Sequence, residues 1–486
     1  MKVALMIAAS IVAGSAAGAA PAVAAGAPGA AAATAVNHVN VPVPANERVT
    51  LPNGLRLVLV PRHDIPLVAF NLLLRGGARL DPPGRDGAAA LAADLLTHGA
   101  GSRDAYAFAD AVEGAGGNLD AAAHAEYIQV QGQFLAHDSR LMLGLLADAV
   151  LRPRFAAGEF EKLRERRIEE LKAAKDSSPQ ALLGSYGRAL LFADHPYGRP
   201  VSGSEASLAR LALADVTRLY AAQSGADRAI LVIAGDFDPA QVRRDVAAVF
   251  GRWPRASAPL PPLAPAARVH GRRLLLVDSP GSAQTYLWMG NVGVPRHYDL
   301  RPALNIANLA LGGSFGSLLN RELRLKAGLT YDASSRFNRG AVAGEFAIST
   351  FTQTDNTARA LELALATLGR FKQDGLDAAA TDSARNYLLG QFPLAFETPY
   401  DWAVALGDLD FYDLPESYIS RFGSDLVAAS AASIRAVIDD AFPSPDDLDI
   451  VLVGDAARIR DSIARFGPVT TMPLAAPEFA PPAPSR

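Results

Sequence analysis

Two side chains with complementary donor chemistry stand seven positions apart in the second half of the chain. In residues 320–337 (NRELRLKAGLTYDASSRF), helix-forming residues run to Ala327, and Gly328 stands where a left-handed helix cap is expected. Arg324 is predicted in the last turn of this helix and Tyr331 just inside the following strand. A chain reversal at the glycine would bring guanidinium and phenol to one ligand, and both can donate to a carbonyl or carboxylate oxygen. Taken alone, the pattern is better interpreted as a helix-terminal arginine and a half-buried tyrosine than as a ligand-binding pair.

The histidines exclude a hydrolytic zinc site of the common local kind. In a zincin helix two histidines stand four residues apart, so that both imidazoles point from one face at one metal. No two of the eight histidines are that close: His38, His63, His98, His124, His137, His195, His270 and His297. The sequence therefore contains no zinc site built from a local histidine pair.

A glycine-rich segment matches the pattern of a serine-hydrolase nucleophile elbow. Residues 312–316 (GGSFG) fit G-x-S-x-G, but that elbow needs a strand before the serine and a helix after it. The preceding residues 302–311 (PALNIANLAL) have a helical pattern, so the glycines are interpreted as the end of one helix before the start of another. A serine hydrolase stays a remote alternative, which predicts loss of activity on Ser314→Ala.

The beginning of the chain is typical of a secretory signal. Lys2 supplies a minimal positive charge, residues 3–14 supply an apolar run, and residues 22–24 (AVA) form a cleavage site. The run is too short to span a bilayer, and no later stretch of about 20 apolar residues follows. A lipid anchor would need a cysteine, and the chain has none. We therefore expect a mature protein that starts near Ala25, without a membrane span, in a bacterial periplasm.

The amino-acid composition excludes further kinds of site and partner. Without cysteine there are no disulfides, thiolate metal ligands or cysteine nucleophiles. The formal net charge is −4, and the basic residues of segment 161–170 alternate with glutamates, which is typical of a solvated helix face. Nothing basic clusters strongly enough to indicate a nucleic-acid partner.

Strand and helix patterns alternate along both halves. Residues 49–62 are predicted to be two strands joined by an Asn53-Gly54 turn, and residues 67–75 a buried strand. Helical periodicity follows in residues 87–96, and a strand is expected over residues 119–130.

The two halves resemble each other. Residues 229–242 and 448–459 each have a buried strand, a Gly-Asp turn and a helix start, and the Gly-Asp pairs are about one half-length apart. Residues 253–268 carry five prolines and are interpreted as an extended linker. An internal duplication at so long a period indicates two similar domains, although two unrelated α+β domains would give a similar composition.

The predicted fold class is therefore α+β, with two homologous domains, each an antiparallel sheet with helices packed on one face. The predicted divisions are a signal peptide 1–24, a flexible leader 25–46, an N-terminal domain 47–253, a proline-rich linker 254–268, a C-terminal domain 269–470 and a disordered tail 471–486.

Taken together, these segments resemble the pitrilysin/insulinase family of zinc peptidases, in particular its mitochondrial-processing-peptidase-like members. The motifs occur in the family's order over residues 49–466: VTLPNGLRLVLVPR, GGARLDPPGRDGAAALAADLL, HPYGRPVSG, AGD and GGSFGSLLNRELRLKAGLTYDASS. The last is the most specific, because the family carries an arginine and a tyrosine seven positions apart there. The resemblance implies a clam-shell arrangement of the two domains and a substrate-contacting role for Arg324 and Tyr331.

The chain departs from the family at the metal site. Active members carry H-x-x-E-H in the first-half helix, with two histidines for zinc and a glutamate as general base. The surrounding residues place that motif on positions 90–94, where Ala90 and Ala93 stand in place of a ligand and the base. Asp94 is expected at the helix surface, and Glu170, the nearest candidate for the third ligand, cannot hold zinc by itself. No cofactor is expected in this chain.

Some members of the family are similar but divided between two chains, one with the zinc site and one with the Arg/Tyr pair. The resemblance implies that this chain is the second type: the non-catalytic subunit of a periplasmic heterodimeric metallopeptidase, whose partner carries H-x-x-E-H and zinc and whose substrates are peptides. Asn118, before a predicted edge strand, is a further substrate-binding candidate by the same resemblance. The alternative is a stand-alone peptide-binding or assembly protein on the same scaffold.

Overall fold

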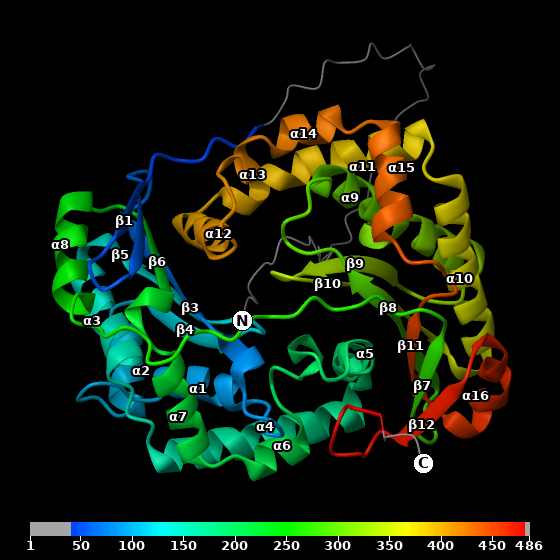
Figure 1. Ribbon diagram of the computed structural model, residues 1–486, viewed down its shortest axis with the longest axis horizontal. Helices are drawn as coiled ribbons and strands as arrows, with labels where there is room; N and C mark the ends of the chain where they lie inside the picture. Colours follow the sequence, from blue (N-terminus) through cyan, green and yellow to red (C-terminus); the bar gives the residue numbers. More distant parts are fainter. Residues whose placement is uncertain (1–39, 482–486) are drawn as a thin grey trace, which may run out of the picture.

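The computed structural model describes residues 40–481 and contains two six-stranded sheets (Figure 1). The predicted signal peptide 1–24 and leader residues 25–39 lie outside the described part of the chain. In order across the first sheet, the strands are β1 (Glu47–Thr50), β2 (Arg56–Pro61), β6 (Ala229–Gly235), β3 (Leu67–Arg75), β5 (Tyr127–Leu135) and β4 (Asn118–Ala123). Across the second they are β12 (Val469–Pro473), β7 (Arg273–Asp278), β11 (Asp449–Gly454), β8 (Gln284–Gly293), β10 (Gly344–Gln353) and β9 (Ala333–Arg339).

Five successive strands have the same order in both sheets, and only the strand outside β2 or β7 comes from a different part of the chain, so the α+β fold with two similar domains is confirmed. Most neighbouring strands are antiparallel, as predicted, and a minority of the pairs are parallel. Strand β6 runs parallel to β2, and β11 and β12 run parallel to β7. Each of these strands returns after at least one helix, and such a crossover lets a strand enter parallel to an earlier one. Apolar periodicity does not record strand direction.

The strand predicted over residues 119–130 is also corrected. It is a hairpin, in which β4 ends at Ala123 and β5 starts at Tyr127. The side chains of both arms alternate with the same period, so the turn between them left no break in the pattern.

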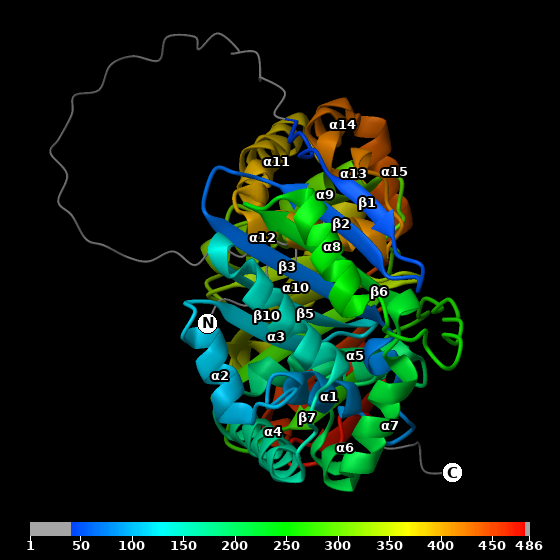
Figure 2. The same cartoon turned by 90° about the vertical axis from the view of Figure 1, so that its left-hand side faces the viewer.

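Seven helices of the first half accompany the first sheet, and they pack on its outer face, where Figure 2 shows α3 and α8. They are α1 (Ala88–Leu96), α2 (Ala105–Glu113), α3 (Ser139–Leu151), α4 (Ala157–Ser177), α6 (Glu205–Arg210), α7 (Leu213–Gln223) and α8 (Pro239–Phe250). The second sheet is accompanied by α9 (Arg301–Asn308), α10 (Thr357–Asp374), α11 (Ala378–Gln391), α13 (Ser417–Ser420), α14 (Phe422–Ala428), α15 (Ala431–Ala441) and α16 (Ala456–Ile463).

The other face of each sheet is covered by a helix from the opposite half (Figure 1). Helix α12 (Pro399–Phe411) of the second half packs on β3 and β6, and helix α5 (Leu183–Phe192) of the first half packs on β8 and β11. The helices that each half packs on its own sheet lie on one face of that sheet, as predicted, and the opposite half covers the other face. The central strands carry apolar side chains on both faces because both faces are buried, for example in residues 229–235.

Each end of the described chain also packs against the opposite half. Of the predicted flexible leader, residues 40–46 lie along the second half: Val41 is buried there, and the Ser424 N–H donates to Asn40 Oδ1 at 3.0 Å. The predicted disordered tail is wrong up to residue 481, because β12 extends to Pro473 and Phe479 is buried against Tyr186 of α5. Apolar side chains within a proline-rich composition supply this anchoring.

Residues 254–268 contain no helix or strand. The segment is held by first-half side chains, since His195 Nε2 lies 2.9 Å from the Ala264 carbonyl oxygen and Arg79 Nη2 donates to that of Pro261. None of the helices in residues 40–481 combines the length and the apolar character needed to cross a membrane.

Candidate functional site: an arginine between two aromatic rings

The helix that carries Arg324 follows a glycine-rich break in the chain. After α9, residues Leu309–Gly313 form a π-helical turn, Ser314 is extended, and a second π-helical segment spans Asn320–Lys326. The residues before the serine are thus helical, and the strand that a nucleophile elbow needs is not there. Asn320, which is buried, donates from Nδ2 to the Ser314 carbonyl at 3.1 Å and accepts at Oδ1 from the Ala333 N–H at 3.0 Å. It therefore joins the glycine-rich break to the start of β9.

The reversal after this helix occurs where the sequence predicts it. Gly328 has φ +62°, its N–H donates to the Arg324 carbonyl, and the Leu329 N–H reaches back to the Leu323 carbonyl at 2.8 Å. Tyr331, however, lies in the loop two residues before β9 and not inside the strand. Thr330 accounts for this, because its hydroxyl bonds the backbone of Asp332 and so holds a local turn.

The reversal brings the predicted pair together. The guanidinium carbon of Arg324 lies 4.3 Å from the ring centroid of Tyr331 and 4.6 Å from that of Phe315. Both rings are largely exposed, at 72% for Tyr331 and 62% for Phe315. The arginine is thus held by two cation–π contacts, which fix its plane without using its N–H groups. Among the described residues, neither its guanidinium nor the Tyr331 hydroxyl has a hydrogen-bond partner.

Phe315 was missed by reasoning from the sequence. It lies in the segment interpreted only as a helix break. An exposed aromatic residue within a glycine-rich loop was the available signal, but its contact with Arg324 depends on a loop that returns to the helix nine residues later.

The degenerate metal position is filled by an ion pair. Ala90 and Ala93 are buried on α1, and Asp94 is half-buried one turn after Ala90. Arg167 on α4 donates to Asp94 Oδ2 from Nε at 2.8 Å, and its Nη2 lies 2.7 Å from the same oxygen. Asp94 therefore ties α1 to α4, which is more than the helix-surface role expected for it. Glu170, one turn further along α4, is exposed.

This arrangement does not fit zinc. Two methyl groups supply no ligands, and a guanidinium cation occupies the one carboxylate that remains. Nowhere in residues 40–481 do three or more histidine, aspartate or glutamate side chains gather closely enough to hold a metal ion.

Asn118 begins β4, the outermost strand of the first sheet. Its Oδ1 accepts from the Gln133 N–H at 3.1 Å, and its Nδ2 reaches Asp120 at 3.4 Å. The side chain thus serves the hairpin, while the outer edge of β4 pairs with no other described strand. Arg324 and Tyr331 lie beside the outermost strand of the other sheet, so the structure does not gather all three candidates in one cluster.

Comparison with known proteins shows the family to which the chain belongs. Residues 57–205 match the model of insulinase (peptidase family M16), and residues 210–388 match that of the peptidase M16 inactive domain. An uncharacterized zinc protease of Mycobacterium tuberculosis is 30% identical over 354 residues, which cover 73% of this chain and 81% of that protein. The chain belongs to the M16 peptidase family. Its lost metal ligands and its match to the inactive domain make it a member of the inactive type.

Other M16 relatives differ in how they are described. A Helicobacter pylori protein described as a non-peptidase homolog is 26% identical over 342 residues, or 69% of this chain and 77% of that protein. Two crystal structures share the fold at a TM-score of 0.79: a peptidase M16 inactive domain from Pseudomonas fluorescens and a protease from Helicobacter pylori. They are 23% and 19% identical, and the match covers 85% of this chain and 98% and 100% of theirs.

Proposed function

We propose that this M16 chain is the non-catalytic subunit of a periplasmic heterodimeric zinc peptidase. Its partner would carry the H-x-x-E-H helix and the zinc ion, and this chain would contribute Arg324 and Tyr331. The observation that carries the proposal is the contrast between the two halves. The metal position of α1 is closed by the Asp94–Arg167 ion pair, whereas Arg324 is half-buried beside an exposed Tyr331, and no other described side chain engages the pair by a hydrogen bond or ion pair.

The Arg324–Tyr331 pair suits a peptide carbonyl that acquires negative charge. A guanidinium fixed between two rings can present its N–H groups without first losing much side-chain freedom, and a phenol beside it adds a neutral donor. Donors that are already in place where charge develops account for much of the rate in acyl-transfer enzymes. We assign this orienting and oxyanion-stabilising role to Arg324 and Tyr331, acting on a peptide held at the partner's metal.

The surroundings of the pair support a protein partner. Phe315, Leu325 and Tyr331 are among the most exposed large apolar side chains of the described chain, at 62%, 59% and 72%. Exposed apolar side chains gathered around a charged group are typical of surfaces that other proteins cover.

The test is a peptide assay of the reconstituted pair. Arg324→Ala or Tyr331→Phe should each lower kcat/KM on the order of 10²-fold, as expected for the loss of a donor to the oxyanion. Arg321→Ala, which removes an exposed arginine one turn earlier in the same helix, is the matched control and should change little. Kinetics that are unchanged in the Arg324 and Tyr331 variants would reject the role.

A second function, peptide binding without proteolysis, is favoured by the relative described as a non-peptidase homolog. It predicts that the protein purified from its own periplasm is a monomer that binds peptides. Recovery of a complex with an H-x-x-E-H chain would decide against it. Under either function the isolated chain should show no chelator-sensitive peptidase activity.

A further inference from the structure

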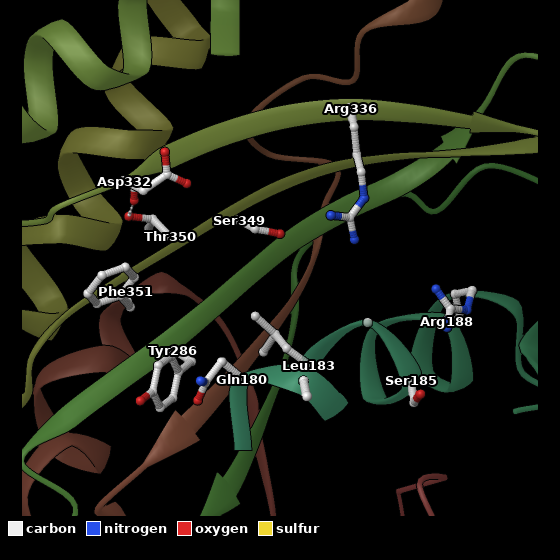
Figure 3. A pocket seen from close by; sticks show the side chains of 12 residues that line it. Gln180, Leu183, Ser185, Arg188, Tyr286, Asp332, Arg336, Ser349, Thr350 and Phe351 are labelled. Carbon is white, nitrogen blue, oxygen red and sulfur yellow. Dashed lines mark hydrogen bonds between the residues drawn. The ribbon is translucent and has the colours of Figure 1, made fainter. Parts of the chain in front are cut away.

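A cavity of about 370 Å³ lies between the two halves, next to the Arg324–Tyr331 site (Figure 3). One wall is α5 with the turn before it, from the first half, and the other is the end of the second sheet formed by β8, β9 and β10. Asp332, the residue after Tyr331, lines one end. A ligand bound at the Arg324–Tyr331 site therefore has this cavity within reach.

Two arginines, one from each half, converge in the cavity. Figure 3 shows Arg188 of α5 and Arg336 of β9 pointing into the space between helix and strand. A methyl group added at Gly184 would lie 3.3 Å from Arg188 Nη1 and 3.8 Å from Arg336 Nη2, so both guanidinium groups reach one point beside this glycine. Because Gly184 has no side chain, the space between the two cations is left open.

The positive charge of this pair is poorly balanced. Within residues 40–481, Arg336 forms no ion pair, and Arg188 has only a 3.9 Å approach to Glu345. Glu345 is buried, and its Oε1 accepts a 2.9 Å hydrogen bond from Asn338, so one carboxylate charge faces two guanidinium charges. The other acid, Asp332, belongs to the opposite end of the lining (Figure 3).

The strand register adds a neutral donor on the same face. Arg336 pairs with Ala347 across β9 and β10, so Ser349, two residues further along β10, is its diagonal neighbour. Its hydroxyl lines the cavity. Two guanidinium forks and a hydroxyl form a donor set for an oxyanion, and Arg is well suited to bidentate contact with a carboxylate.

We propose that this cavity is a specificity subsite that binds a carboxylate of the peptide substrate, either an acidic side chain or the C-terminal carboxylate. The inference rests on the proposed function, since the peptide is the ligand of the Arg324–Tyr331 site. Arg336 lies within β9, and Tyr331 lies in the turn two residues before that strand begins. The preferred carboxylate therefore lies a short way along the peptide from the bond that the site addresses.

Calorimetric titration of the full chain at physiological salt tests the subsite. Three peptides of one length are compared: one with a single Glu and an amidated C-terminus, its Gln counterpart with the same amide, and the Gln peptide with a free carboxylate. Of the two peptides that carry a carboxylate, one should bind the wild type at least about tenfold more tightly than the amidated Gln peptide does. This ratio is expected for charge-assisted hydrogen bonds to a guanidinium. Arg336→Gln should reduce that ratio to about one, and Arg188→Gln should lower it as well.

Arg359→Gln, which changes an exposed arginine of α10, is the matched control and should leave the ratio intact. Arg324→Ala should weaken all three peptides by a common factor without changing the ratio. If Arg324→Ala has no effect while the ratio depends on Arg336, the proposed function fails and the subsite stands.

Equal affinity of the wild type for all three peptides would overturn the subsite, as would a ratio that survives both Arg336→Gln and Arg188→Gln in folded protein. Inorganic phosphate is the competing source of the same chemistry. Phosphate that binds in an Arg336-dependent way, without any preference among the peptides, would overturn the assignment to a peptide carboxylate.

Discussion

The side chain of Arg167 contacts the one carboxylate that remains at the degenerate metal position, that of Asp94. Its guanidinium contacts Asp94 through both Nε and Nη2, and the two side chains are similarly half-buried. The ion pair joins α1 to α4 without a metal. Loss of the ligands on α1 and a cation from α4 therefore act together against zinc binding.

This predicts what is needed to restore a metal site. The combined change Ala90→His, Ala93→Glu and Asp94→His rebuilds the motif, with Glu170 on α4 as the available third ligand. While Arg167 is present, its charge beside a dication should weaken zinc binding on the order of tenfold, from the Coulomb energy of charges a few ångströms apart in a hydrated site. When Arg167→Ala is added, zinc affinity measured by competition with a chelator should rise by about that tenfold factor. Equal zinc affinity with and without Arg167 would show that the guanidinium does not obstruct the site.

Helices α5 and α12 each pack on the sheet of the opposite half, and each makes its close contact there at a glycine. A methyl group at Gly187 of α5 would lie 2.6 Å from the indole of the buried Trp288, and one at Gly407 of α12 would lie 2.6 Å from the amide of the buried Asn71. Neither sheet neighbour can move away easily, because both are enclosed. The glycines thus set the closest approach between each helix and its sheet.

We predict that Gly187→Ala destabilises the fold by about 1–3 kcal/mol, the usual cost of overpacking a core, and lowers the thermal midpoint. Gly144→Ala, within helix α3, is the control, since nothing lies within 4 Å of its added methyl group. There the better helix propensity of alanine should leave stability unchanged or raise it by up to about 1 kcal/mol. A Gly187 variant as stable as wild type would mean that α5 does not pack closely on Trp288.

The buried carboxyl group of Asp81 accepts hydrogen bonds from the start of helix α1, and its burial disfavours its ionisation. Asp81 accepts from the Gly87 and Ala89 N–H groups, each at 2.8 Å, and burial raises its pKa to about 7 despite these bonds. Below about pH 4 the group is protonated in both the folded and the unfolded chain. As pH rises from there toward 7 the unfolded chain ionises first, so the contribution of Asp81 to stability is lost over that range.

The variant Asp81→Asn should remove this dependence while keeping an acceptor oxygen for one of the two N–H groups. Thermal midpoints of wild type and variant are compared at pH 5 and pH 8. The wild type should lose more stability than the variant between these values. Parallel shifts of both proteins would contradict a raised pKa of Asp81.

At the scale of the whole molecule, one buried carboxylate joins the halves. Glu126, in the turn between β4 and β5, accepts from the Tyr197 hydroxyl at 2.6 Å, the Ala341 N–H at 3.0 Å and the Tyr412 hydroxyl at 2.7 Å. Two of these donors belong to the second half. Burial, with the charge of Glu126 itself, raises the pKa of Tyr197 and Tyr412, so both phenols stay protonated as donors.

Replacement of this acceptor should weaken the junction. Glu126→Ala leaves three donors without their partner, and we expect a loss of at least about 2 kcal/mol in the free energy of unfolding, measured in urea. Glu113→Ala, at an exposed position of α2, should stay within about 0.5 kcal/mol of wild type. Because each sheet shares a core with the other half, wild type should unfold in one transition. Two separate transitions in the wild type would show that the halves are independent.

Local chemistry in the sequence was enough for several features. The missing histidine pair, the left-handed cap at Gly328 and the seven-residue spacing of Arg324 and Tyr331 all depend on residues within one or two turns of each other. The duplicated strand and turn likewise predicted two similar domains. Side-chain periodicity and cap chemistry act over that short range, so one segment records them by itself.

Tertiary structure alone decided the rest. Phe315 joins Arg324, Arg167 fills the metal position, α5 and α12 exchange sheets, and the chain end around Phe479 is ordered. Each of these depends on a partner that the fold brings in from elsewhere, up to hundreds of residues away. An apolar or charged residue shows in the sequence that it needs a partner, but which partner satisfies it is determined only when the whole chain packs.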